Sequence, residues 1–145
     1  MTERTQKKNI LPEGLLFGEA NFEERMRKEV QPWLKNQVKD GYFRSWDGSR
    51  IHYLSAVHPR ERAAVVFSHG FCEFSGKYHE MMYYFYQMGY SVFFMEHRGH
   101  GFSRRFLKDL HKVYVKSYQE YVKDLHVFVD GIVKKRSKSG ELYLF

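Results

Sequence analysis

Cysteine is nearly absent from this sequence. Cys72 is the only one in 145 residues, so the chain forms no internal disulfide. Disulfides belong to oxidising compartments, whereas cytosolic proteins keep their thiols reduced. The first ten residues are charged and lack the apolar core of a secretory signal peptide. Together these two absences predict a cytoplasmic location.

Long hydrophobic runs, internal repeats and low-complexity tracts are also missing. No uninterrupted apolar stretch approaches the roughly 20 residues that span a bilayer, so we expect no transmembrane segment. Hydrophobic residues nevertheless make up 43% of the sequence and aromatic residues 18%, which excludes a disordered composition. A chain of 145 residues is long enough to bury a core, and one domain is the natural expectation.

Acidic residues are fewer than basic ones, 17 against 24, and the net charge is +7. Such a chain could bind nucleic acid or anionic lipid through phosphate contacts, but its Lys and Arg are interleaved with Glu and Asp. The densest basic run, 134–138, follows an apolar-periodic stretch and suits a helix C-terminus and a loop. No nucleic-acid motif is present, and the aromatic residues follow core periodicity. We therefore expect no nucleic-acid partner, and steeply salt-dependent binding to DNA or anionic vesicles would be needed to support a basic binder.

The N-terminal part predicts a helix that packs across the main body. Asn21 followed by Glu24 has the form of a capping box. Pro32 then interrupts the helix or starts a new one. We assign residues 1–40 to an N-terminal helical segment and residues 41–145 to the main domain. The helical spacing rests on three apolar residues: Phe22, Met26 and Val30.

The main domain opens with a predicted hairpin. Two β-rich runs, 42–46 and 50–56, flank Asp47-Gly48, a turn signal. The next runs, 63–67 and 91–95, are continuously apolar, as is typical of parallel strands buried on both faces.

Two helices and a last strand complete the pattern. Between the parallel strands, one helical stripe contains Tyr78, Met82, Phe85 and Met88, and Gly89 suits the position just after its C-terminus. Residues 141–145 predict another buried parallel strand. The whole is an α/β fold in three layers, a hairpin followed by β-α-β-α-β. The second helix, at about 115–134, has its stripe at Val115, Tyr118, Val122, Leu125, Val129 and Ile132.

Chemistry in such folds lies beyond the carboxyl ends of the parallel strands. The segments there are "SHGFCEFSGKY" and "EHRGHGFSRR". Gly70 lets the backbone turn sharply, and N–H groups after such a turn can face a developing oxyanion. A plain strand-to-helix loop is the simpler interpretation of this segment alone. Four histidines lie in or near these loops, His69, His79, His97 and His100, but none are paired at useful helical spacing. We expect no metal site and no cofactor, and we interpret His97 and His100 as structural.

The combination of segments is more specific than any one of them. "HGFCEFSGKY", "GYSVFFMEHRGHGFS" and "SYQEYVKDLHVFV" closely resemble the monoacylglycerol lipase and lysophospholipase branch of the α/β-hydrolases, also labelled serine aminopeptidase-like. That branch has HG-x-x-E-x-S-x-x-Y, then GY-x-V-x-x-x-DHRGHG-x-S, then a helix with YV-x-D. This chain matches all three, with Glu96 in place of the usual Asp. The resemblance covers about 41–145.

The resemblance implies the N-terminal half of an α/β-hydrolase fold. Its last strand would lead into the nucleophile elbow, G-x-S-x-G, and the acid and base would follow. The 145 residues contain none of the three, and we expect a chain truncated before the elbow. By resemblance, the Phe71 N–H is one oxyanion donor, and His69, Gly70 and Cys72 support its loop.

No other side chain is a convincing nucleophile. Ser103 has Gly101 two residues before it but Arg105 two residues after, and it follows the wrong strand. Ser75 lies beside Gly76 without an elbow pattern. We interpret both serines as loop residues that bond locally. Cys72 has no assigned base.

Two functional hypotheses follow from the resemblance. The chain is part of a serine hydrolase that cleaves a lipid ester, with peripheral association to a membrane compatible with such a substrate. Alternatively, it is a non-catalytic truncated fragment or pseudo-enzyme that folds only with a complementing partner. An unpaired edge at the last strand would favour self-association.

Overall fold

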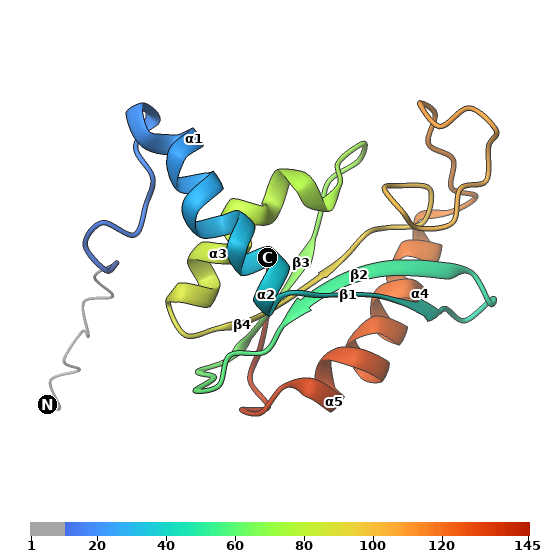
Figure 1. The fold of residues 1–145 in the computed structure, drawn as a ribbon. Helices are drawn as coiled ribbons and strands as arrows, with labels where there is room; N and C mark the ends of the chain where they lie inside the picture. The colour runs from blue at the N-terminus through green and yellow to red at the C-terminus, as the bar shows by residue number, and fades with distance from the viewer. Residues whose placement is uncertain (1–10) are drawn as a thin grey trace, which may run out of the picture.

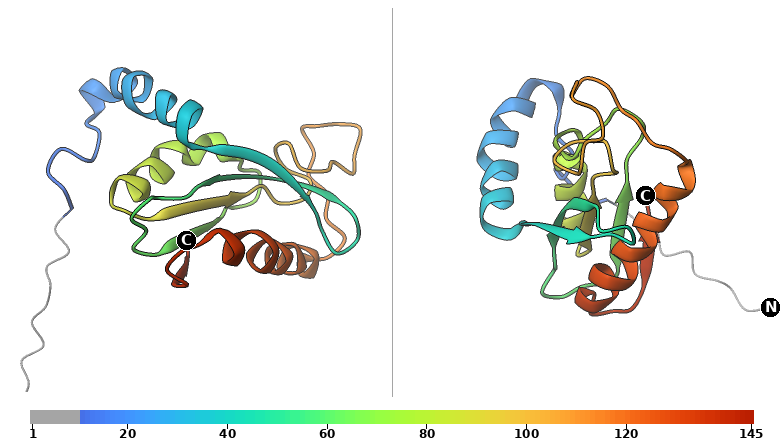
Figure 2. Two further views of the ribbon diagram at one scale, coloured as in Figure 1. Left: turned by 60° about the horizontal axis from the view of Figure 1, so that its bottom comes forward. Right: turned by 90° about the vertical axis from the view of Figure 1, so that its right-hand side faces the viewer.

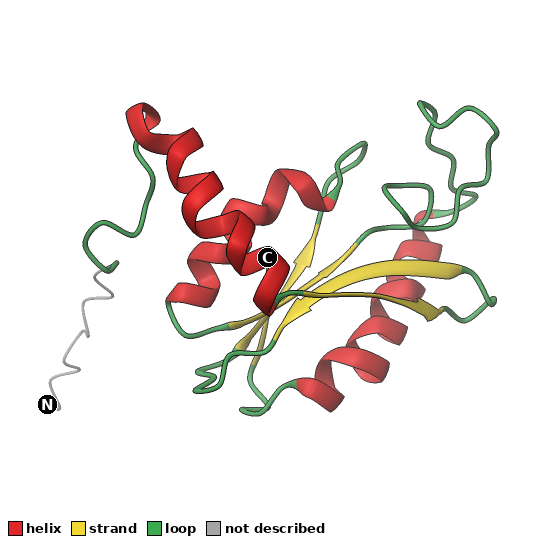
Figure 3. Cartoon of the chain, in the orientation of Figure 1, coloured by secondary structure: helices red, strands yellow, loops and turns green. Residues whose placement is uncertain are grey.

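The computed structural model describes residues 11–145 and shows a five-stranded mixed sheet with helices on both faces (Figures 1 and 3). The strand order is β1-β2-β4-β3-β5. The last three strands along the chain run parallel, and the first two form an antiparallel hairpin. The predicted α/β fold is confirmed. The strands are β1 Lys39–Arg44, β2 Arg50–Ala56, β3 Ala64–Ser68, β4 Ser91–Met95 and β5 Leu142–Leu144.

The helices form the two outer layers. The N-terminal helices and α3 cover one face of the sheet, and α4 with α5 covers the other (Figure 2). No helix within residues 11–145 combines the length and apolarity needed to cross a bilayer. The helices are α1 Phe22–Arg25, α2 Gln31–Gln37, α3 His79–Gln87, α4 Tyr118–Phe128 and α5 Lys134–Arg136, with π-helical turns at Met26–Val30 and Val129–Val133.

The central strands β3 and β4 are apolar except for Ser68 and Ser91 at their ends, because both of their faces are covered. In β3, Val65 and Phe67 join the core beneath α2 and α3, whereas Ala64 and Val66 join the core beneath α4. Successive side chains of a strand point to opposite faces, so a two-sided burial needs a continuous apolar run. The prediction for 63–67 and 91–95 is confirmed.

The capping box predicted at Asn21 does not form. The Asn21 side chain accepts a hydrogen bond from the Gly18 N–H, 3.0 Å away, and Glu24 pairs with Lys28 instead. Pro32 starts α2 in the first turn, and the π-helical turn precedes it. The wider turn accommodates the missing N–H and the bulk of the proline ring. Residues 1–10 of the predicted N-terminal segment lie outside the described residues, and the division at residue 40 stays a prediction.

The hairpin forms, but its first strand ends earlier than 46. Arg44 pairs with Arg50, and Ser45 starts a five-residue loop closed by the Ser45 N–H donating to the Ser49 carbonyl over 2.9 Å. Gly48 adopts φ +78°, a left-handed conformation that glycine accepts without strain. The loop carries Asp47 toward the β4–α4 loop, where it bonds Arg98.

The apolar stripe predicted for 115–134 is partly wrong. The helix begins only at Tyr118, with Ser117 as its N-cap. Tyr118 and Val122 are exposed, and the fully buried positions of α4 are Asp124 and Phe128. A buried aspartate breaks the expected pattern because Arg98 binds it, a pairing that hydrophobic periodicity cannot reveal.

The C-terminal strand is parallel, as predicted, but it is not buried. β5 runs parallel to β3, with Ala64 opposite Leu142, and Phe145 continues the ladder through its N–H to the Val66 carbonyl at 2.8 Å. Tyr143, Leu144 and Phe145 are at least half exposed. Within residues 11–145, no strand pairs with the outer edge of β5. The prediction of a buried strand is therefore wrong for these side chains.

Replacing Phe128 tests which face of α4 packs on the sheet. Phe128 is completely buried, and its ring stacks on Phe43 with the centroids 5.6 Å apart. We expect Phe128→Ala to lower the free energy of unfolding by about 3–5 kcal/mol. Tyr118→Ala, on the same helix but 72% exposed, should change it by less than about 0.5 kcal/mol. Urea unfolding measures both, and equal losses would contradict the observed helix orientation.

Candidate active site

Two loops meet at the carboxyl ends of the parallel strands. The first, residues 69–74, follows β3, and the second, residues 96–117, connects β4 to α4. They face each other across a cleft of about 280 Å³. Cys72, Glu73 and Phe74 line it from the first loop. The second loop contributes His100, Gly101, Arg105, Leu110, His111 and Val113.

Backbone hydrogen bonds shape the 69–74 loop. The Gly70 N–H donates to Glu73 Oε2 over 2.9 Å, and the Cys72 N–H donates to His100 Nε2 over 3.0 Å. Between them, the Phe71 N–H has no acceptor among residues 11–145. The loop thus fixes both neighbouring N–H groups and leaves one donor free.

Cys72 holds an unusual backbone conformation. Its φ of +62° is the only positive φ of a non-glycine residue in the described part of the chain. This conformation costs roughly 1–2 kcal/mol for a residue with a Cβ. The hydrogen bond from Cys72 to His100 helps to hold it. Its thiol is free and the residue is exposed.

The two loops are joined by three histidines. His69 Nε2 accepts the His97 N–H at 2.9 Å, and His69 Nδ1–H donates to the Gly70 carbonyl at 2.7 Å. His100 Nδ1–H donates to the Arg98 carbonyl at 3.1 Å. An imidazole that accepts on one nitrogen and donates from the other is neutral. Burial favours the neutral form, and it lowers the pKa of His69 and His100 and brings the pKa of His97 to about 3.

No group of three His, Cys, Asp or Glu side chains within residues 11–145 is arranged to hold a metal ion. The fourth histidine of these segments, His79, begins α3.

Glu96 is the buried hub of the second loop. Its carboxylate accepts hydrogen bonds from the N–H groups of Ser75 at 3.0 Å and Phe102 at 2.8 Å, and from His52 Nδ1 at 2.8 Å. Burial alone would raise the pKa of Glu96, but these donors lower it to about 2. The motif that this segment resembles has Asp at this position, and here the Glu96 carboxylate contacts all three donors.

His52 bridges two carboxylates. Its Nδ1 faces Glu96, and its Nε2 lies 2.8 Å from Asp40 Oδ1. Burial would lower the pKa of His52, but the two carboxylates raise it above its ordinary value of 6.5. Two carboxylates flanking one imidazole favour the form in which both nitrogens carry protons, which is the charged form.

Arg98 ties the second loop to two other elements. Its guanidinium is 1% exposed and bonds both oxygens of Asp124 on α4 at 2.7 Å. It also donates to Asp47 in the hairpin loop at 3.0 Å. Burial would raise the pKa of Asp47, but the hydrogen bonds from Arg98 and Ser49 lower it to about 2. The Ser45 hydroxyl completes the cluster by donating to Asp124.

The structure places the two candidate serines inside the protein. Ser103 is buried and donates its hydroxyl to the Glu96 carbonyl while accepting the His52 N–H. Ser75 is also buried. Neither hydroxyl faces the cleft as a nucleophile would.

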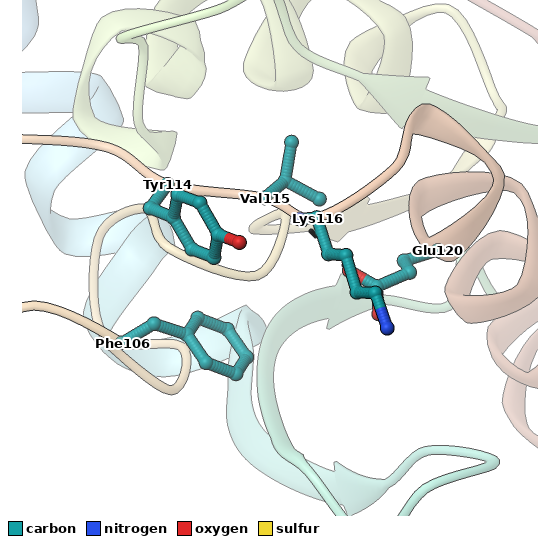
Figure 4. A pocket seen from close by; sticks show the side chains of 5 residues that line it. All are labelled: Phe106, Tyr114, Val115, Lys116 and Glu120. Carbon is teal, nitrogen blue, oxygen red and sulfur yellow. Dashed lines mark hydrogen bonds between the residues drawn. The ribbon is translucent and has the colours of Figure 1, made fainter.

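A second, smaller pocket of about 190 Å³ lies between the β4–α4 loop and the start of α4 (Figure 4). Phe106 and Tyr114 stand on one side of it, and Lys116 extends beside Glu120 on the other. It shares no lining residue with the first cleft.

Sequence reasoning assigned no structural role to His52, Asp124 or Arg98. Asp124 and Arg98 are part of the matched motifs, which marked the positions but not their pairing. His52 lies in a strand that carried no motif, and no sequence signal identified it.

The buried His52–Glu96 pair predicts a pH dependence of stability. Its contribution is complete between the ordinary pKa values of 4.5 for Glu96 and 6.5 for His52. It is lost as the pH rises through the raised pKa of His52, and also as the pH falls toward 2 and Glu96 is protonated.

We expect His52→Gln to lower the free energy of unfolding by about 3 kcal/mol near pH 6, with the difference from wild type shrinking in alkaline solution. Urea unfolding across the pH range measures this. His126→Gln, which removes an exposed imidazole of α4 that lies 4.0 Å from Asp130, should change the free energy of unfolding by less than about 0.5 kcal/mol. A difference for His52→Gln that stays constant with pH would contradict a charged His52.

Comparison with known proteins places these loops in a family. A family model described as "Serine aminopeptidase, S33" matches residues 59–145. Lysophospholipase L2 of Escherichia coli (strain K12) is 39% identical over 78 residues, 54% of this chain and 22% of that protein. Monoacylglycerol lipase of Mycolicibacterium smegmatis is 34% identical over 68 residues, 47% of this chain and 22% of that protein.

A solved structure agrees with the fold. The crystal structure of a highly thermostable carboxyl esterase from Bacillus coagulans, in complex with glycerol, superposes with a TM-score of 0.60 at 25% identity. The match covers 75% of this chain and 35% of that one. The matched segments cover 22% of the length of each of these two relatives, so the chain corresponds to only part of them. Because the family model covers more than half of the chain and the three-layer fold agrees, the chain belongs to the serine aminopeptidase S33 family of α/β-hydrolases.

Proposed function

We propose that this chain supplies the oxyanion loop of a serine hydrolase that cleaves carboxylic esters of lipids, either monoacylglycerols or lysophospholipids. One observation carries the proposal. The Phe71 N–H has no acceptor among residues 11–145, while hydrogen bonds occupy the N–H groups on both sides of it. A free donor on a loop whose other donors are fixed suits an oxyanion that forms only during the reaction.

The lipid ester is inferred from the matched relatives, which are a lysophospholipase and a monoacylglycerol lipase. The cleft between the two loops is consistent with it, because Cys72, the residue after Phe71, lines it together with apolar and polar side chains. Arg105 in the lining can meet a phosphate-bearing head group, and Phe74 and Leu110 offer contacts for an acyl chain.

In the proposed reaction a serine attacks the acyl carbonyl, and negative charge develops on the carbonyl oxygen. The Phe71 N–H donates to that oxygen. His69 and His100 hold the 69–74 loop through hydrogen bonds of their neutral imidazoles. These two side chains therefore need no counter-ion in order to keep the Phe71 N–H in position. One such donor contributes about 10²–10³ in rate. The 145 residues contain no G-x-S-x-G pattern, so they do not supply the attacking serine, and the acid and base are likewise unassigned.

A second candidate function is a non-catalytic chain that folds with a complementing partner. The outer edge of β5 favours it, since Tyr143 and Leu144 are exposed beside unpaired backbone groups. Such an edge can pair with another strand, either from a partner or from a second copy of the chain.

A chimera tests the first proposal. Residues of this chain replace the segment that they match in E. coli lysophospholipase L2, which supplies the remaining catalytic residues. We expect the chimera to hydrolyse lysophospholipid and to react with a fluorophosphonate probe, whereas the 145-residue chain alone does neither. Phe71→Pro removes the N–H and should lower kcat by about 10²–10³. Phe71→Ala keeps the N–H and should stay within about tenfold of the parent chimera.

Equal kcat values for the two Phe71 variants, with both folded by circular dichroism, would remove the oxyanion role. A folded chimera without any hydrolysis would favour the non-catalytic alternative. Fluorophosphonate labelling of the 145-residue chain alone would show that one of its own serines is a nucleophile and would overturn our assignment of the missing centre.

A further inference from the structure

The segment that links β4 to α4 exposes apolar side chains in an unusual concentration. Residues 106–112 are exposed without interruption, and the wider stretch 102–118, which we name the apolar–basic loop, projects beyond the sheet (Figures 1 and 2). An isolated exposed apolar residue needs no explanation, but a cluster marks an interaction surface. The exposed fractions are Phe102 73%, Phe106 37%, Leu107 39%, Leu110 60%, Tyr114 51% and Tyr118 72%.

The same loop carries a concentrated positive charge. Five of its residues are Lys or Arg and one is acidic, which gives a net charge of +4 out of +7 for the whole chain. The single acid, Asp109, already pairs with Lys112 at 3.6 Å. None of the other four cations forms an ion pair with a carboxylate among residues 11–145; they are Arg104, Arg105, Lys108 and Lys116.

Internal contacts hold the loop in its projecting shape. Arg105 donates to the carbonyls of Gly99 and Leu110, the second over 2.7 Å. The Arg104 guanidinium lies 4.8 Å from the centre of the Phe106 ring and bonds the Ser49 hydroxyl at 3.1 Å. The exposed apolar side chains therefore lie on a loop that internal contacts already order, which reduces the loss of conformational entropy on binding.

The loop borders the proposed substrate cleft. Leu110 and Arg105 line that cleft opposite Cys72 and Phe74. On the facing loop, Phe71 is 68% exposed and Phe74 is 48% exposed, so the apolar surface continues across the mouth of the cleft. Both loops lie at the same edge of the sheet because β3 and β4 are parallel.

We propose that the apolar–basic loop docks on the surface of a membrane that contains anionic lipids. Charge complementarity and composition identify this occupant. Unpaired cations attract phosphate head groups, and exposed Phe, Leu and Tyr side chains enter the boundary between head groups and acyl chains. The phosphates of a nucleic acid would bind the cations, but its bases stack on aromatic side chains and make no such contact with the exposed leucines. The expectation that all aromatic residues follow core periodicity is wrong for this loop.

Flotation of the full chain with vesicles tests the proposal by binding alone, so the result is independent of the proposed hydrolase activity. Vesicles that float in a density gradient separate bound protein from aggregates, which sink. We expect the chain to float with phosphatidylcholine vesicles that contain about 30% phosphatidylglycerol. It should float poorly with pure phosphatidylcholine, and about 0.5 M NaCl should release most of it.

Matched variants locate the surface. Lys108→Gln, Lys112→Gln and Lys116→Gln together should weaken binding to anionic vesicles about a hundredfold. The control triple, Lys134→Gln, Lys135→Gln and Lys138→Gln, removes the same charge at the opposite edge of the sheet and should weaken it less than about threefold. Leu107→Ser with Leu110→Ser should weaken it about tenfold at unchanged charge.

Three results would overturn the proposal. One is equal binding to neutral and anionic vesicles, and another is equal loss for the two lysine triples. The third combines two observations: double-stranded DNA displaces the chain from the vesicles, and the Leu107→Ser, Leu110→Ser variant binds the vesicles as tightly as wild type does. That outcome would assign the loop to polyanions in general.

Discussion

The buried guanidinium of Arg98 is the interaction on which the arrangement of the site depends. An arginine side chain does not lose its proton in a protein, so a guanidinium that is 1% exposed needs anionic partners. Asp124 comes from α4 and Asp47 from the hairpin loop. One side chain thus fixes three elements that are distant in sequence. Because Arg98 lies in the β4–α4 loop, these contacts also fix the position of the loop that lines one side of the cleft.

A chain of contacts leads from Arg98 to the candidate oxyanion donor. The Arg98 carbonyl accepts from His100 Nδ1, and His100 Nε2 accepts the Cys72 N–H. Cys72 holds the 69–74 loop in the conformation that leaves the Phe71 N–H free. Burial keeps His100 neutral by lowering its pKa, and only a neutral imidazole can accept the Cys72 N–H while donating to Arg98. The chemistry of the loop therefore depends on groups that never meet the substrate.

The order of the elements could be predicted from the sequence, and the polar cluster could not. Continuous apolar runs predicted β3 and β4 because burial on both faces is a local pattern of residue types. The same periodicity argument failed at Asp124 on α4, because the burial of this carboxylate depends on an arginine 26 residues away in the sequence. Asn21 bonds backward to Gly18, a choice between two local partners that spacing does not decide. The free Phe71 N–H and the exposed face of the apolar–basic loop are properties of the folded chain alone.

A double-mutant cycle on Arg98 and Asp124 tests the central claim most directly. The free energy of unfolding is measured by urea for wild type, Arg98→Met, Asp124→Leu and the double variant. Arg98→Met leaves the buried Asp124 carboxylate without a cation, and Asp124→Leu leaves the buried Arg98 guanidinium with Asp47 but without its buried partner, so each single replacement should cost about 3–5 kcal/mol. The double variant removes both charges, so its cost should fall short of the sum by at least about 2 kcal/mol. Additive costs would show that the two side chains do not depend on each other, and would contradict the account.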